Sequence, residues 1–120
     1  MTQENKELLL KDLCARLPYG VKMSVNDNVE VLQGINIVDN IVEYSSFLAS
    51  EIEDCKPYLF PLSSMTEEQE KEYNDLNCYE LGCFPHSEEA LDYLTKNHFD
   101  YRYLIEKGLA IDATGLNIYF

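Results

Sequence analysis

Residues 21–47 read VKMSVNDNVEVLQGINIVDNIVEYSSF, and this stretch decides the fold. Apolar and polar side chains alternate along it, as in strands that have one packed face and one solvated face. The NDN at 26–28 and the DN at 39–40 indicate turns, and Gly34 indicates a bulge or a break. We therefore expect three or four short antiparallel strands in a meander, with an SH3-like half-barrel as one form that it could take.

A helix is predicted before this meander and an irregular segment after it. Leucines recur at helical spacing through residues 3–16, and Pro18 with Gly20 ends the helix. The later segment CKPYLFPL, residues 55–62, contains two prolines, which confine it to an edge strand or an extended loop because proline cannot donate a ladder hydrogen bond.

Two helices are predicted in the second half of the chain. Thr66 and Gln69 fit a capping box, which predicts a surface helix from about residue 66. After a loop with glycine and proline, Ser87 opens a second helix with an apolar face. We expect a single α+β domain over 1–120, with a helix and antiparallel sheet in 1–65 and a mainly helical 66–120 that packs on one face of the sheet.

The segment HFDYRYLIEKGLAI, residues 98–111, could form an acid–base site or a structural corner. We favour the corner, with Asp100 as the N-cap of a third helix over 101–107 and Gly108 as its end. Arg102 is then expected to stack on a neighbouring tyrosine or to pair with an acid of another helix.

Composition excludes several function classes. The chain has 120 residues with 46% hydrophobic content, enough for one core, and a formal net charge of −13. Residues 66–92 contain nine acids against Lys71 alone. Direct binding to nucleic acid or to an anionic membrane is therefore not expected, because both need a cationic surface. No apolar run is long enough to span a membrane and no secretion signal is present, so we expect a cytoplasmic protein with reduced thiols.

No catalytic, cofactor or metal site is predicted. Cys78, Cys83, His86 and His98 have the chemistry of zinc ligands but no established spacing. Cys14 has Lys11 and Arg16 nearby in the sequence but lies next to the apolar stripe of the first helix, and Cys83 lies in an acidic loop, so neither is expected to be an activated thiolate. No phosphate-binding glycine loop is present.

A protein-binding surface is the remaining prediction. Nine tyrosines are compatible with positions at the edge of the core, but tyrosine is also enriched at interfaces, and we select Tyr19, Tyr58 and Arg102 as partner-binding residues. The acids of 66–92 either form solvated helix faces or engage a basic site. The C-terminal GLNIYF either completes a sheet or binds a partner, so a homo-oligomer is a further alternative.

Three segments carry a resemblance to a known family. LLLKDLCARLPYGV (8–21), KPYLFPLSSMTEE (56–68) and HFDYRYLIEKGLA (98–110) resemble signature segments of small, uncharacterised proteins encoded by gut Bacteroidales bacteria and by their phages and prophages. The resemblance covers about a third of the chain. It implies a phage or prophage setting in a bacterial cytoplasm and assigns no activity or catalytic residue.

These observations lead to two functional hypotheses. The first is a non-enzymatic acidic binding protein of phage or prophage origin, in its most specific form an inhibitor that occupies the basic channel of a host defence or nucleic-acid-handling protein. The alternative is a small enzyme or nucleotide-binding protein, which requires a pocket with convergent polar groups.

Overall fold

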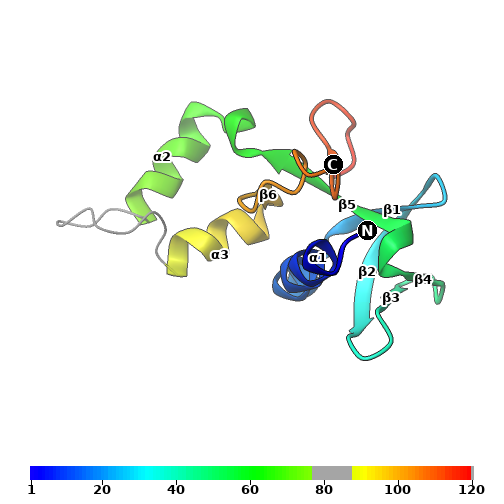
Figure 1. The fold of residues 1–120 in the computed structure, drawn as a ribbon. Helices are drawn as coiled ribbons and strands as arrows, with labels where there is room; N and C mark the ends of the chain where they lie inside the picture. The colour runs from blue at the N-terminus through cyan, green and yellow to red at the C-terminus, as the bar shows by residue number, and fades with distance from the viewer. Residues whose placement is uncertain (77–87, 120) are drawn as a thin grey trace.

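The computed structural model describes residues 1–76 and 88–119 and has an α+β fold (Figure 1). An N-terminal helix precedes a sheet of several strands, and two further helices follow. The predicted fold class is therefore confirmed. The prediction of a single domain over 1–120 stays a prediction.

The described strands form one mixed sheet in the order β4-β3-β2-β1-β5-β6, with β7 paired to β5. β1 to β4 form the predicted antiparallel meander. β5 pairs in parallel with both β6 and β7, so the sheet is not antiparallel throughout. The strand bounds are β1 Lys22–Val25, β2 Asn28–Asn36, β3 Ile41–Tyr44, β4 Ala49–Glu51, β5 Cys55–Pro61, β6 Phe99–Asp100 and β7 Ile111–Asp112.

The turns of the meander lie where the sequence predicts them. Asn26 and Asp27 connect β1 to β2 with φ values of 49° and 66°, and this left-handed pair matches the twist of a two-residue hairpin. Asn and Asp tolerate that backbone region better than other residues that carry a side chain. The pairing register of β2 with β3 shifts between Leu32 and Gly34, which confirms the predicted bulge.

The prediction for CKPYLFPL is wrong, because β5 is an internal strand. Its first residues, as far as Pro57, pair with β1, while Tyr58–Pro61 faces β7 and then β6. The partner of the strand thus changes at Pro57. A proline is tolerated there because the ladder with β1 ends at the residue that lacks an N–H.

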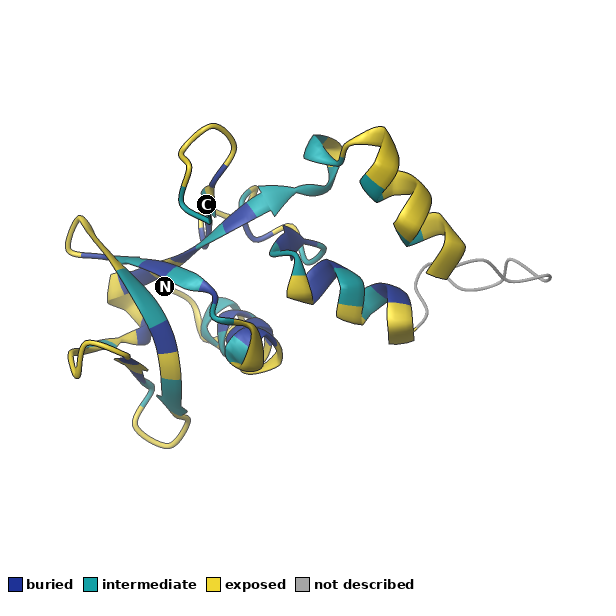
Figure 2. Cartoon of the chain, turned by 180° about the vertical axis from the view of Figure 1, so that it is seen from behind, coloured by how far each residue is buried: buried dark blue, intermediate teal, exposed yellow. Residues whose placement is uncertain are grey.

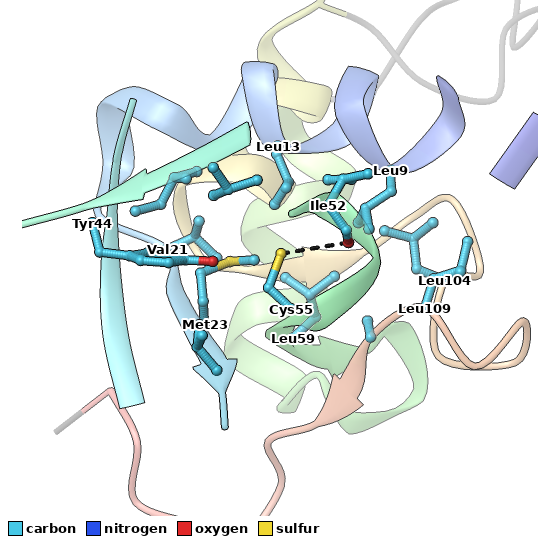
Figure 3. Close-up of a cluster of buried hydrophobic side chains, with 14 residues drawn as sticks. Leu9, Leu13, Val21, Met23, Tyr44, Ile52, Cys55, Leu59, Leu104 and Leu109 are labelled. Carbon is cyan, nitrogen blue, oxygen red and sulfur yellow. Dashed lines mark hydrogen bonds between the residues drawn. The ribbon is translucent and has the colours of Figure 1, made fainter. Parts of the chain in front are cut away.

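The core lies between the sheet and helix α1 (Gln3–Arg16), as Figure 3 shows. Thr2 caps this helix by accepting a hydrogen bond from the amide of Asn5. Leu9 and Leu13 are fully buried, and each such side chain contributes about 2 kcal/mol of hydrophobic stabilisation. The other members of the cluster are Val21, Met23, Val25, Leu32, Val42, Tyr44, Ile52, Cys55, Leu59, Leu104, Leu109 and Ala110.

Helices α2 (Glu67–Leu76) and α3 (Glu88–Lys96) lie beside each other, away from the core between α1 and the sheet (Figure 1). The reciprocal hydrogen bonds between Thr66 and Gln69 confirm the predicted capping box at the start of α2. No residue of α2 is buried, and Figure 2 shows it exposed along most of its length. α3 buries Ala90, Leu94 and Thr95 and contacts both α1 and β6.

The predicted helix over residues 101–107 is wrong, because these residues form turns. Asp100 belongs to β6, and Tyr103 has a φ of 59°, which a right-handed helix cannot contain. Asp100 and Gly108, the residues expected to begin and end this helix, still make the interactions that are typical of helix ends. The Asp100 carboxylate accepts hydrogen bonds from the amides of Leu104 and Ile105, at 2.9 Å each. Gly108, with a φ of 73°, ends the single turn with the hydrogen-bond pattern of a helix C-terminus.

Candidate functional site

A pocket of about 500 Å³ lies where the beginning of α2, the end of α3, β5 and the C-terminal segment meet. This volume is within the range of about 300–1,000 Å³ that is typical of small-molecule sites. The residues that line it are Phe60, Ser64, Thr66, Gln69, Lys96, Asn97, His98, Phe99, Thr114, Gly115 and Tyr119.

A sharp corner after α3 forms one wall of the pocket. α3 ends at Lys96, and His98 has a φ of 64°, which redirects the chain into β6. The His98 carbonyl accepts a hydrogen bond from the amide of Phe60 at 2.8 Å, which fixes the corner to β5. The chain does turn at residue 98, but α3 leads into the strand β6 there and not into the predicted third helix.

Aromatic rings form the apolar part of the pocket. The imidazole of His98 stacks on the Tyr119 ring with a centroid separation of 3.8 Å, and the Phe60 ring lies 5.8 Å from that of Tyr119. Burial, together with the charges of Arg16 and Lys22, lowers the pKa of His98 to about 4. His98 is therefore neutral at neutral pH. Its Nδ1 atom is buried without a hydrogen-bond partner, while Nε2 makes no hydrogen bond within the described chain.

Tyr119 is held in place by the sheet. Its hydroxyl donates to the Tyr58 carbonyl at 2.7 Å and accepts from the Lys22 amide at 2.9 Å, so it bridges β5 and β1. Burial raises the pKa of Tyr119, which keeps the hydroxyl protonated. The Lys22 ammonium also donates to the Ile118 carbonyl. The described part of the C-terminal segment, residues 115–119, is therefore anchored to its own sheet through Ile118 and Tyr119.

A buried ion cluster lies behind the corner. Asp12 accepts from Arg16 Nε at 2.7 Å and from Arg102 Nη1 at 3.0 Å, and the side chains of Asp12 and Arg16 are fully buried. Arg16 also donates to the Phe99 carbonyl, and both guanidinium groups lie over the Tyr101 ring. The cluster connects α1 to the chain after α3, which is a structural role.

The three charged or titratable residues considered for an acid–base site in segment 98–111, His98, Asp100 and Arg102, do not converge on one site. His98 lines the pocket, Asp100 accepts backbone amides in the turn that follows, and Arg102 pairs with Asp12. The expected stacking of Arg102 on a tyrosine and its expected pairing with an acid of a helix are both confirmed.

The predicted partner-binding residues lie on separate elements. Tyr19 is exposed at the end of η1 (Leu17–Tyr19), Tyr58 is half-buried on β5, and Arg102 is held by Asp12. No hydrogen bond, ion pair or ring contact joins any two of these three side chains. Their role in partner binding stays a prediction.

The zinc hypothesis concerns residues that are mostly outside the described chain. Cys78, Cys83 and His86 lie in the undescribed segment 77–87. In residues 1–76 and 88–119 no group of three metal-ligating side chains is present. Of the remaining thiols, Cys14 is exposed on α1, and burial raises the pKa of Cys55.

The acidic surface is concentrated on α2 and α3, which we call the acidic arm. α2 has five acids and Lys71, and α3 has three acids and Lys96. Glu72 accepts a hydrogen bond from the Tyr93 hydroxyl between the two helices, and burial together with this carboxylate raises the Tyr93 pKa to about 12. The described ion pairs do not include any acid of the arm.

Sequence reasoning missed the pocket and two of its polar residues, Gln69 and Lys96. The lining residues come from segments near 60–69, 96–99 and 114–119, and no spacing in the chain indicates that these segments meet. The sequence does indicate that Asp12 and Arg16 are buried, because their spacing places both residues on the helix face of Leu9 and Leu13.

Comparisons with protein-family models, with curated proteins and with solved structures find no match to this chain. Within the described residues no helix has the length and apolar character needed to cross a membrane.

Proposed function

We propose that this chain is a non-enzymatic acidic binding protein, of phage or prophage origin, that engages a basic face of a protein partner in the bacterial cytoplasm through the acidic arm. The origin is supported by the resemblance of the three sequence segments. In its most specific form, the partner is a host defence or nucleic-acid-handling protein whose basic channel the arm occupies.

One observation carries the proposal. α2 buries no residue, and none of its five acids forms an ion pair with a described residue. Neighbouring unpaired carboxylates on a helix repel one another, so this arrangement costs the helix stability when the protein is alone. A cationic partner surface would remove that repulsion and would also steer association.

The test is affinity purification of the tagged protein from its infected or lysogenic host, followed by measurement of the affinity for the recovered partner. An arm variant with Glu68→Gln, Glu70→Gln and Asp75→Asn removes three exposed charges from α2. A control variant with Glu43→Gln, Glu51→Gln and Glu106→Gln removes three exposed charges elsewhere.

We expect the arm variant to bind at least about tenfold more weakly than the control variant, since exposed carboxylates contribute through long-range attraction. Wild-type affinity should also fall as the salt concentration rises from about 0.05 to about 0.5 M, because salt screens exposed charges. Affinity that is independent of salt and equal in the two variants would contradict the proposal.

A further inference from the structure

We propose that the pocket between α2, α3 and Tyr119 is a binding site for a small ring-bearing anion, with a carboxylate or a phosphate as its charged group. This inference does not rest on the proposed function, since it concerns a concave site rather than the exposed acids of the arm. It rests on the charge of the lining, on its unused hydrogen-bond donors and on its ring-lined wall.

The charge of the lining differs from that of the rest of the molecule. The chain has 22 acids, yet none of the described residues that line the pocket is Asp or Glu. Lys96 is the cationic residue among them, and its ammonium makes no ion pair or hydrogen bond with a described residue. An anion in the pocket therefore meets the positive charge of Lys96 and no carboxylate among the described lining residues.

Several polar groups in the pocket have unused donor capacity. Gln69 uses its Oε1 atom to accept the Thr66 amide, and its side-chain NH₂ has no acceptor among the described residues. The Thr66 hydroxyl accepts from the Gln69 amide and keeps its own hydrogen available. These donors lie on the first turn of α2, where the helix dipole also favours a negative group.

The remaining wall suits a planar ring. The Phe60 ring lies within edge-to-face distance of two other rings, with its centroid 6.2 Å from that of Phe99 and 5.8 Å from that of Tyr119. His98 is neutral and stacked, so its Nε2 atom adds a polar position without a charge. Rings bury apolar area against such walls and gain edge or face contacts as well.

The experiment is a titration followed by amide NMR with two anionic probes and their neutral counterparts. Adenosine 5′-monophosphate is compared with adenosine, and 4-hydroxybenzoate with 4-hydroxybenzyl alcohol, so that the phosphate and carboxylate sources are distinguished. We expect saturable shifts at Lys96–Phe99 and at Thr114 and Gly115 with at least one anion. Its neutral counterpart should bind roughly tenfold more weakly, because it lacks a charge-assisted hydrogen bond.

The matched variants are Lys96→Gln, which removes the pocket charge, and Lys71→Gln, which removes an exposed charge of α2 that does not line the pocket. Both positions are exposed, so the fold should be retained and is checked by circular dichroism. Lys96→Gln should weaken anion binding by about tenfold and Lys71→Gln by less than about twofold. The inference is overturned if neither anion binds, if neutral and anionic probes bind equally, or if the two variants behave alike.

Discussion

Asp12 is the residue on which the buried ion cluster depends. Its carboxylate is the acceptor for Arg16 and Arg102, and both Asp12 and Arg16 are fully buried. Replacing it in Asp12→Asn leaves the Arg16 guanidinium buried beside a neutral group, which should lower the free energy of unfolding by about 3–5 kcal/mol. Urea denaturation measures this loss. The exposed Glu7→Gln on the same helix is the control, with an expected change below about 0.5 kcal/mol.

His98 makes the stability depend on pH. Its pKa is about 4 in the folded protein against an ordinary value of 6.5, so the unfolded chain binds more protons between these values. The free energy of unfolding therefore has its full value, as far as His98 is concerned, above pH 6.5, and it decreases as the pH falls towards 4. Allowing for the partial exposure of the ring, the loss should be about 1–2 kcal/mol.

The variant His98→Asn isolates this contribution, because asparagine tolerates the left-handed backbone at position 98 and does not titrate. Denaturation of both proteins at pH 7 and at pH 4.5 gives the comparison. The carboxylates titrate alike in both, so the wild type should lose more stability than the variant. Equal losses would show that His98 is not neutralised by the fold.

At the scale of the elements, α2 should behave as a local unit. Its capping box joins Thr66 to Gln69, and no residue of the helix is buried. Thr66→Ala removes the cap, at a cost of about 1 kcal/mol to the helix. Because α2 contributes no buried side chain to the core, this cost should appear as faster hydrogen exchange of α2 amides with little change in global unfolding. A matching fall in global stability would mean that α2 unfolds together with the core.

Elements specified by neighbouring residues could be predicted from the sequence. The meander follows from alternation and from the turn residues Asn26 and Asp27, and the start of α2 follows from Thr66 with Gln69. The helix expected over 101–107 does not form, although Asp100 still accepts the amides of Leu104 and Ile105, because Tyr103 has a left-handed backbone that interrupts a helix.

At the scale of the whole molecule, the features that could not be predicted from the sequence depend on contacts between segments far apart in the chain. β5 is internal because its later half meets strands that lie about forty or more residues further along the chain, as in the pairing of Phe60 with Phe99. The pocket has the same origin, since β5, the corner at His98 and the C-terminal segment form it together. Candidate binding residues chosen by type, such as Tyr19 and Tyr58, therefore could not locate it.

One hydroxyl group joins the C-terminal segment to both β1 and β5. Tyr119 bonds the backbone of Lys22 and that of Tyr58, 97 and 61 residues away along the chain. Tyr119→Phe keeps the ring against His98 but leaves a part-buried N–H and carbonyl without this partner, which should lower the free energy of unfolding by about 1–3 kcal/mol. Urea denaturation is the measurement, with Tyr103→Phe as the exposed control. If the two variants are equally stable, the segment does not hold β1 and β5 together, and the pocket wall that depends on Tyr119 is not fixed in the free protein.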